Sequence, residues 1–349
     1  MAQNFLLSRA ARDLDIGEIH RMTEEESIAR FRQLCWPDTH GEPVCPYCSK
    51  QDPYVLATPN KWKCRGCKRQ FTPTSGTVFR SHKLSYRQIL VTAALFVNGV
   101  NGVAACRMAR EIKVAYKAAF VLLHKLREAM GADDAAAMLG GVVEMDGAVF
   151  GRDHNRMPND VLEGKKFFST YKQAARTKKR LIVVIRERVG QDPSIPDKVR
   201  TFLLRKEGDA VEIARKIVMP DAVVHADFGT GWEPLHAYFH TKRINHSLHY
   251  SHDGACTNQA ESFFSRMRTA ERGVHKHISG AHLHRYAMEL GWREQFRRKS
   301  NGFQFAQLIN AGGRLPPSTT FKGYWRKRPS NDDAKPPAND GDDFFAQFA

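Results

Sequence analysis

Four cysteines form two CxxC pairs, Cys45 with Cys48 and Cys64 with Cys67, which are separated by fifteen residues. Zn²⁺ prefers four thiolates in a tetrahedron, and each CxxC turn supplies two of them from one tight bend of the chain. This spacing is typical of a structural zinc site, and the alternatives are four unrelated buried cysteines or a redox pair. The remaining cysteines lack partners at a suitable spacing and are interpreted as packing residues: Cys35, Cys106 and Cys256.

The segment around these cysteines has the pattern of a small ribbon. Tyr54–Leu56 and Trp62–Lys63 are expected to form two strands joined by a turn at Pro59 and Asn60. Basic side chains crowd the second CxxC pair: Lys61, Lys63, Arg65, Lys68 and Arg69. Such residues beside a ribbon indicate contact with phosphate, mainly through Arg65 and Lys68, and the alternative is a solvated charged loop.

Three carboxylates lie where strands end or a helix begins. Asp146 and Asp227 follow apolar runs, and Glu261 lies near the start of a helical segment. A carboxylate at the end of an apolar strand is costly unless it binds something, and Mg²⁺ prefers such hard oxygen ligands. Three acids brought together suit two divalent cations that support an in-line displacement at phosphorus. Each acid also has a simpler explanation: a strand-end turn for Asp146, an Asx turn for Asp227, and helix capping with Asn258 for Glu261.

The elements that must position these acids form an α/β pattern after a small-residue linker at 131–141. Strands are predicted at four places: 142–150, 181–189, 198–204 and beginning at 222–225. A helix is predicted at 209–218, and a helical region at 258–296 with breaks near Gly273 and Gly280. Arg268 lies two helical turns after Glu261 and therefore faces the same side. We interpret Arg268, together with Arg266, as holding the DNA backbone, and the alternative is an exposed arginine on a polar face.

Between the ribbon and the linker the pattern is helical from about Leu84 to Met130. Ser85 and Gln88 have the spacing of a capping box, and Asn98 with Gly99 ends this first helix. A helix pair is expected next, at 101–110 and 115–130 with a turn at 111–114. Its size and order are those of a helix-turn-helix that reads the major groove, with Lys117 and Lys125 off the apolar stripe, and a plain helical hairpin is the alternative. Ahead of the ribbon, Ile19–Leu34 carries an imperfect helical stripe.

The charge balance favours a polyanionic partner. Lys and Arg number 54 against 37 Asp and Glu, so the formal net charge is +17 in 349 residues. The longest apolar stretch, around Ile89–Val97, is too short to cross a bilayer, and the first residues lack the pattern of a signal peptide. We therefore expect a cytoplasmic, nucleoid-associated protein that binds DNA and no membrane. The end of the chain from about Gly312 is rich in Pro, Gly, Asn and Asp and is predicted to be a disordered tail.

The order of these motifs resembles a known family. The strings CPYC and CRGC, a helical pair, and then EMDG, HADFG and TNQAESFFSRMR are similar to the zinc-ribbon DDE transposases of bacterial insertion sequences. The closest group is insertion-sequence family fifteen-ninety-five, and the resemblance covers about residues 25–300. It implies a ribonuclease-H-like α/β fold, Mg²⁺ or Mn²⁺ at the catalytic site, and cleavage and joining of DNA at transposon ends.

By this resemblance, Asp146, Asp227 and Glu261 are the three catalytic, metal-binding acids, and Arg268 is the basic residue that follows them. The family often has His-Thr-Asn before the third acid, whereas this chain has Cys256 in place of the histidine, and Asn258 is an alternative third residue. The resemblance also implies a homo-oligomer on DNA.

Five segments follow: a helical lead-in at 1–40, a zinc ribbon at 41–75, a helix-turn-helix at 80–132, a catalytic domain at 140–300, and a tail at 312–349. The predicted function is a DNA transposase that binds terminal inverted repeats. The alternatives are a zinc-ribbon DNA-binding regulator with a vestigial catalytic domain, and a structure-specific nuclease of the same fold.

Overall fold

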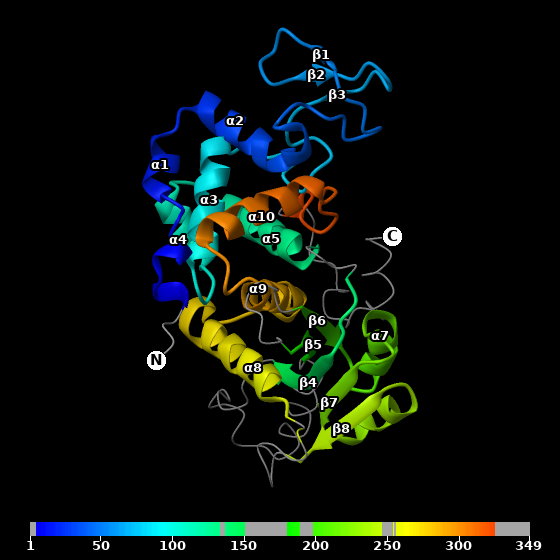
Figure 1. The fold of residues 1–349 in the computed structure, drawn as a ribbon. Coiled ribbons are helices and arrows are strands. Elements are labelled where there is room, and N and C mark those ends of the chain that lie inside the picture. The colour runs from blue at the N-terminus through cyan, green and yellow to red at the C-terminus, as the bar shows by residue number, and fades with distance from the viewer. Residues whose placement is uncertain are drawn as a thin grey trace, which may run out of the picture. The chain divides into compact units, whose positions relative to one another are not determined.

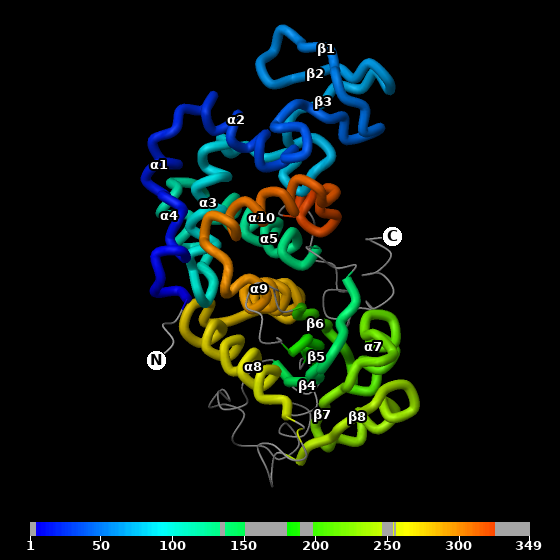
Figure 2. The backbone as a smooth tube through the Cα atoms, viewed as in Figure 1, coloured from blue at the N-terminus to red at the C-terminus, as the bar shows by residue number. Residues whose placement is uncertain are grey.

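Helices and a three-stranded ribbon make up the N-terminal unit of the chain, and a five-stranded sheet with helices makes up the second (Figures 1 and 2). The first unit joins Met1–Asp134 to Phe296–Pro329, and the second contains Ala135–Gln295 and Ser330–Ala349. The computed structural model describes residues 5–132, 137–150, 180–188, 198–245, 254 and 256–324. In this part of the chain, no helix is long and apolar enough to cross a membrane.

The ribbon consists of three two-residue strands, β1 (Tyr54–Val55), β2 (Trp62–Lys63) and β3 (Gln70–Phe71), paired antiparallel in that order. The two predicted strands are confirmed, and β3 was not predicted. Asn60 takes a left-handed conformation in the turn between β1 and β2, with φ of 56°. A small core forms around the cysteines from Trp62 and Phe71. Because so little apolar surface is buried, the ribbon depends on its cysteine site for stability.

The lead-in is two helices, α1 (Ile16–Arg21) and α2 (Glu24–Cys35), rather than one stripe over Ile19–Leu34. Thr23 starts α2 with a complete capping box, in which its hydroxyl accepts from the Glu26 amide and the Glu26 carboxylate accepts from the Thr23 amide. The predicted helical lead-in is therefore present, and its stripe is divided between two helices where Met22 caps the end of α1 and Thr23 caps the start of α2.

Three further helices follow the ribbon: α3 (Tyr86–Asn98), α4 (Ala105–Glu111) and α5 (Tyr116–Ala132). The capping box at the start of α3 is confirmed. The helix pair is confirmed too, although α4 begins four residues later than predicted, after Gly102 adopts a φ of 89°. No glycine lies in the turn between α4 and α5, where Lys113 takes the left-handed conformation instead, with φ of 53°.

Helix α10 (Asn301–Arg314) has no counterpart among the sequence predictions. It packs against α2, α3 and α5 and buries Phe305, Leu308 and Ile309. The tail predicted from residue 312 therefore starts inside this helix, and residues 325–349 lie outside the described part of the chain. Three short 3₁₀ segments complete the unit: Phe5–Leu7, Arg9–Ala11 and Pro37–Thr39.

The sheet of the second unit has the order β6-β5-β4-β7-β8. Its strands are β4 (Val142–Phe150), β5 (Arg180–Glu187), β6 (Val199–Leu204), β7 (Val223–Asp227) and β8 (His240–Ile244). The first three strands in the sequence pair antiparallel, whereas β7 and β8 run parallel to β4. This order and these directions agree with the ribonuclease-H-like fold that the resemblance implied. The four predicted strands are confirmed, and β8 was not predicted.

Helices cover both faces of this sheet (Figure 1). On one face, α7 (Asp209–Ile217) and the 3₁₀ segment Thr230–Ala237 pack on alternate strand residues such as Val143 and Met145. On the other, α8 (Asn258–Ala270) and α9 (Leu283–Gln295) pack on Ala148 and Phe150. The predicted helix breaks are confirmed, since a π-helical turn at Glu271–His275 and a 3₁₀ turn at Gly280–His282 separate α8 from α9.

Candidate active site and zinc site

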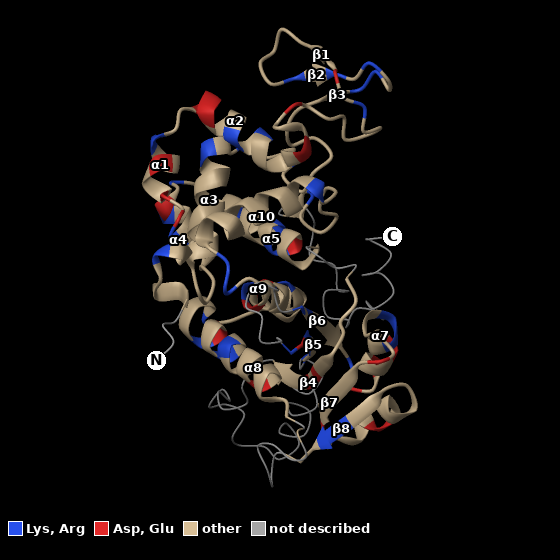
Figure 3. Ribbon diagram, in the orientation of Figure 1, with Lys and Arg blue, Asp and Glu red and all other residues tan. Residues whose placement is uncertain are grey.

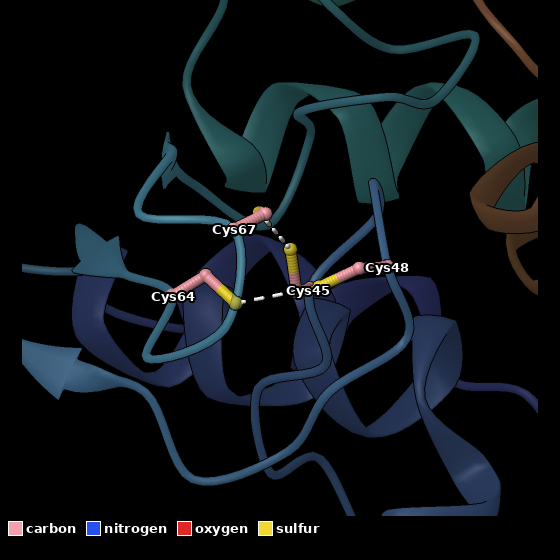
Figure 4. Close-up of side chains that lie close together, drawn as sticks. All are labelled: Cys45, Cys48, Cys64 and Cys67. Atoms are coloured by element: carbon pink, nitrogen blue, oxygen red, sulfur yellow. Dashed lines mark hydrogen bonds between the residues drawn. The ribbon is translucent and has the colours of Figure 1, made fainter.

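The four cysteines of the ribbon lie together with their sulfur atoms facing one another (Figure 4). Cys45 Sγ lies 3.6 Å from Cys67 Sγ, Cys48 Sγ lies 3.5 Å from Cys64 Sγ, and all four sulfurs are within 4.8 Å of one another. Zn–S bonds of about 2.3 Å in a tetrahedron place sulfurs roughly 3.8 Å apart, so this donor set fits zinc. In the described part of the chain, these cysteines are the only such group of His, Cys, Asp or Glu.

The two CxxC turns repeat the same backbone geometry. Ser49 and Lys68, which follow the second cysteine of each pair, both take the left-handed conformation, with φ of 56° and 60°. Their amides donate to the carbonyls of Cys45 and Cys64, at 2.9 Å and 3.2 Å. In the second turn, the amide of Gly66 also donates to Cys64 Sγ at 3.3 Å. The sequence thus builds each half of the zinc site from a single local turn.

Lys and Arg residues gather on the ribbon around β2 and β3 (Figure 3). The Arg65 guanidinium lies 4.4 Å from the centre of the Tyr54 ring, and the Lys68 ammonium lies 6.0 Å from it. Arg65 also pairs with Asp52 at 3.4 Å. The structure therefore brings the two predicted phosphate contacts of the ribbon to one exposed ring.

Asp146 and Asp227 lie on adjacent parallel strands. The register of β4 and β7 places Met145 opposite Ala226, so the next residue on each strand is one of the two aspartates. Both therefore project from the same sheet face, on strands about 4.8 Å apart. Each carboxylate accepts a hydrogen bond at 2.7 Å from the following amide, that of Gly147 or Phe228. Parallel pairing thus joins the two predicted acids across a long separation in sequence.

Glu261 comes to the same place from α8, which covers that sheet face. A cavity of about 680 Å³ is lined by Asp146, Gly147, Ala148, Asn258, Glu261, Ser262, Phe264, Ser265 and Arg268. Arg268 lies over the ring of Phe150, with its guanidinium carbon 5.8 Å from the ring centre. The structure thus groups Asp146, Glu261, Asn258 and Arg268 around one pocket, with Asp227 on the neighbouring strand.

Burial, together with the negative charges of Asp227, Glu261 and Glu207, raises the pKa of Asp146 to about 7, against the opposing effect of the hydrogen bond from the Gly147 amide. The acids are therefore near enough to repel one another. In the described part of the chain, no three carboxylate oxygens lie within 4.8 Å of one another. Repulsion between like charges disfavours such a close approach.

Glu207, immediately ahead of α7, is a fourth acid that the sequence analysis missed. A Cβ atom added to Gly147 would lie 3.2 Å from its Oε1, and one added to Gly229 would lie 3.3 Å from its Oε2. The carboxylate therefore lies between β4 and the loop after β7, where glycines leave room for it. Burial and the charge of Asp227 both raise the pKa of Glu207. No periodic pattern in the sequence points to this residue.

Comparisons with known protein families found a match for the ribbon region and another for the sheet unit. A transposase zinc-ribbon domain matches residues 22–70, and an ISXO2-like transposase domain matches residues 138–295. The two matches together span more than half of the chain. The chain belongs to the zinc-ribbon transposases of the IS1595 family. Searches of curated proteins and of solved structures found no match.

The transposase fixes the start of α8 to the two strands that carry Asp146 and Asp227. Glu144, two residues before Asp146, is fully buried, and its Oε2 accepts from the amides of Gln259 and Ala260 at 2.9 and 3.0 Å. His225, two residues before Asp227, accepts from the Cys256 amide through Nδ1 at 3.3 Å. Both residues therefore hold the start of the helix whose first turn carries Glu261. Alternation along a strand puts i and i+2 on one face, so this signal was present in the sequence.

Buried charges continue behind the start of α8. Arg188 pairs with Glu144 at 3.2 Å, and Arg186 donates to the Gln259 carbonyl at 3.1 Å. Burial raises the pKa of Glu144, although the amides of α8 and these arginines oppose that effect. Arg266, a predicted DNA contact, forms an ion pair with Glu294 of α9 while its side chain stays 41% exposed.

The predicted DNA contacts of the helix pair differ in their surroundings. Lys117 is exposed on the first turn of α5. Lys125 is half-buried and donates to the carbonyl of Arg80 at 3.0 Å, and burial lowers its pKa. Lys117 is thus the more accessible of the two cations for a DNA backbone.

Proposed function

We propose that the transposase cuts the 3′ ends of its insertion element and joins them to target DNA, with Asp146, Asp227 and Glu261 as ligands of two Mg²⁺ or Mn²⁺ ions. The observation that carries this proposal is the placement of Asp146 and Asp227 side by side on β4 and β7, beneath the helix that carries Glu261. Carboxylate oxygens are the ligands these hard cations prefer. Burial and, after it, the charges of the neighbouring acids raise the pKa of Asp146, and bound cations would offset both effects.

Bound cations of this kind supply activation of the attacking oxygen and stabilisation of the leaving 3′ oxygen. The protein's own part is to hold the ligands and the DNA. Two strands of one sheet fix Asp146 and Asp227, and the anchored start of α8 fixes Glu261. Arg268, two turns further along α8, is placed to hold a phosphate at the rim of the same pocket. Asn258 lines that pocket as well and is the alternative third ligand.

End recognition is assigned to the first unit. The ribbon offers Arg65 and Lys68, and the α4–α5 pair offers Lys117 and Lys125, for contact with the terminal inverted repeats. Since transposon ends must be brought together before joining, we propose that the protein works as a homo-oligomer on DNA. Its substrate places it on the bacterial nucleoid.

The test is a cleavage and joining assay on a duplex that carries the DNA end flanking the gene. Asp146→Asn and Asp227→Asn should each lower the cleavage rate at least a thousandfold while end binding stays within about twofold, because each removes one metal ligand. Asp221→Asn, at an exposed turn before β7, is the matched control and should cut at the normal rate.

Two other outcomes would identify different functions. Binding of ends without any metal-dependent cleavage by the unmodified protein would indicate a regulator with a vestigial catalytic domain. Cleavage that never yields joined products, even with target DNA supplied, would indicate a nuclease of the same fold. Normal cleavage by either aspartate variant would refute the assigned ligands.

A further inference from the structure

Residues 318–324, which follow α10, form a strap of turns that packs on the aromatic side chains of α5. Phe321 of the strap is buried, and its ring stacks on that of His124 with the ring centres 5.0 Å apart. Three residues later, the ring of Tyr324 stacks on that of Phe120 at 5.9 Å. The amide of Phe321 also donates to Ser318 Oγ at 3.0 Å, which fixes the bend of the strap. Two stacked ring pairs thus dock the strap on one stripe of α5.

The strap runs toward the start of α5. Phe321 lies against His124, and Tyr324 lies against Phe120, which is one turn closer to the first residue of the helix. The ring of Phe120 in turn contacts that of Tyr116, the first residue, at 5.8 Å between centres. In a helix-turn-helix, the first turns of the second helix are the part that meets the base edges. The strap therefore ends beside the part of α5 that meets DNA in the proposed function.

Positive charge is concentrated where the strap ends. From Lys322 to Arg328 the sequence has four cations and no acid. Lys322 is exposed on the strap, and Arg326, Lys327 and Arg328 follow Tyr324 after a single tryptophan. A charge run near the end of a chain is ordinarily just solvated. Here the docked ring of Tyr324 limits its reach, because a chain spans at most about 3.6 Å per residue and Arg326 is only two residues further on.

We propose that residues 322–328 form a basic arm that binds the phosphate backbone of the DNA end, beside the groove that α5 enters. This inference rests on the proposed function, since it takes α5 as the helix that reads the end. Basic arms that accompany a major-groove helix are a known arrangement in DNA-binding domains. The strap supplies the position and the arm supplies the charge, so the cations lose less freedom on binding than those of an untethered tail.

The main experiment compares two triple variants of the full chain, each of which lacks three cations. The arm variant carries three substitutions after the strap: Arg326→Ala, Lys327→Ala and Arg328→Ala. The control variant carries three at exposed positions before or on α7, in the second unit: Lys206→Ala, Arg215→Ala and Lys216→Ala. Both variants lose the same formal charge, so a general effect of net charge on DNA binding should appear equally in the two.

Affinity for a duplex that carries the DNA end is measured at several salt concentrations. The arm variant should reduce the slope of log affinity against log salt by about 2.7, at about 0.9 for each lost phosphate contact. Its affinity at moderate salt should fall by about tenfold or more. The control variant should keep the slope and the affinity of the wild type.

A second pair of variants tests whether the strap positions the arm. Tyr324→Ala keeps every cation and removes the ring that stacks on Phe120, whereas Tyr324→Phe keeps that ring. In hydroxyl-radical footprints of the end, the wild type and Tyr324→Phe should protect a patch of backbone next to the site of α5. The arm variant and Tyr324→Ala should lose this patch and keep protection at the site of α5 itself. Thermal unfolding checks that each variant is folded.

An arm variant with the same salt slope and affinity as the control variant would overturn the proposal. So would a flanking patch that survives in the arm variant or in Tyr324→Ala. If the wild type binds the end no more tightly than a duplex of random sequence, the proposed end recognition fails instead. The salt slopes of the two triple variants are then compared on the random duplex, where equal slopes again overturn the arm.

Discussion

The zinc ribbon and the acid pocket both gather side chains of the types that bind metal ions, but they do so over very different lengths of chain. In the ribbon, two local turns of the same geometry supply all four sulfurs, which lie within 4.8 Å of one another. In the second unit, β4, β7 and α8 supply one acid each, and the acids remain further apart. Local turns therefore bring ligands together with little supporting structure, whereas distant ligands need a scaffold that is stable by itself.

The supporting structure differs accordingly. The ribbon has a core of a few side chains around its cysteines. The acid pocket stands on a five-stranded sheet with a buried apolar cluster on each face, and buried Glu144 and His225 fix α8 to it. We infer that zinc is part of the ribbon's fold, whereas the cations proposed for the acid pocket are dispensable for the folding of the sheet unit.

The first prediction, with the largest effect, concerns zinc removal. A chelator, or Cys64→Ser with Cys67→Ser, should unfold the ribbon and leave the second unit folded, because apparent zinc binding in such sites contributes about 10–16 kcal/mol. Limited proteolysis should then cut within residues 41–75, and calorimetry should retain the transition of the sheet unit. Cys106→Ser, at an exposed cysteine outside the cluster, is the control and should leave the ribbon protected. A ribbon that resists protease without metal would break the comparison.

The second prediction concerns the anchor of α8. Glu144→Ala leaves the amides of Gln259 and Ala260 and the cation of Arg188 without their buried partner, which should cost about 3–5 kcal/mol of unfolding free energy. Glu144→Gln keeps an acceptor and should cost about 1–2 kcal/mol. Cleavage should fall in the same order, since Glu261 follows directly on the anchored amides. Denaturant unfolding and cleavage rates measure the two effects.

Glu212→Ala is the matched control for this anchor. Glu212 lies on the exposed side of α7 and pairs with Arg215 at 3.2 Å, an exposed ion pair that contributes at most about 1 kcal/mol. If Glu144→Gln proves as harmless as Glu212→Ala to both stability and cleavage, the buried anchor does not position Glu261.

These two regions also differ in what the sequence reveals. The spacing of Cys45, Cys48, Cys64 and Cys67 predicts their site because every contact that builds it is local. The strands that carry Asp146 and Asp227 were predictable from apolar runs, and their acids from the family resemblance. Parallel pairing, which puts those acids side by side, depends on long-range packing that no local pattern encodes.

Residues that act across elements were missed for the same reason. Glu207 reaches the acids only because β4 and the loop after β7 leave space at their glycines. Helix α10 was not predicted, and it is the sequence-distant element that completes the packing of α2, α3 and α5. Glu144 is an intermediate case, since its alternation with Asp146 was visible while its partner, the start of α8, was not.

The third prediction tests whether the acid pocket is folded but electrostatically strained without divalent cations. The folded-state pKa of Asp146 is raised from 3.8 to about 7, so the folded protein holds this proton more tightly than the unfolded chain. The resulting stability is fully present below about pH 4 and is lost as the pH rises to about 7. In zinc-loaded protein without Mg²⁺, Asp146→Asn should therefore unfold at a higher temperature than the wild type at pH 8 and at a similar temperature at pH 4. A difference in melting temperature that is the same at pH 4 and pH 8 would contradict the raised pKa of Asp146.

The smallest expected effect separates the ribbon's metal site from its DNA contacts. Arg65→Ala and Lys68→Ala leave all four cysteines in place, so the ribbon should stay folded and zinc-bound. Each lost phosphate contact should reduce the slope of log affinity against log salt by about 0.9, with a loss of a few-fold in affinity at moderate salt.

Arg215→Ala is the control for this prediction. Arg215 is an exposed arginine on α7, outside the ribbon, and its removal should leave the slope unchanged. Because the Tyr54 ring holds both Arg65 and Lys68, Tyr54→Ala should reduce the slope as well. An unchanged slope in all three ribbon variants would leave the ribbon as a metal-stabilised structure without a role in holding the DNA backbone.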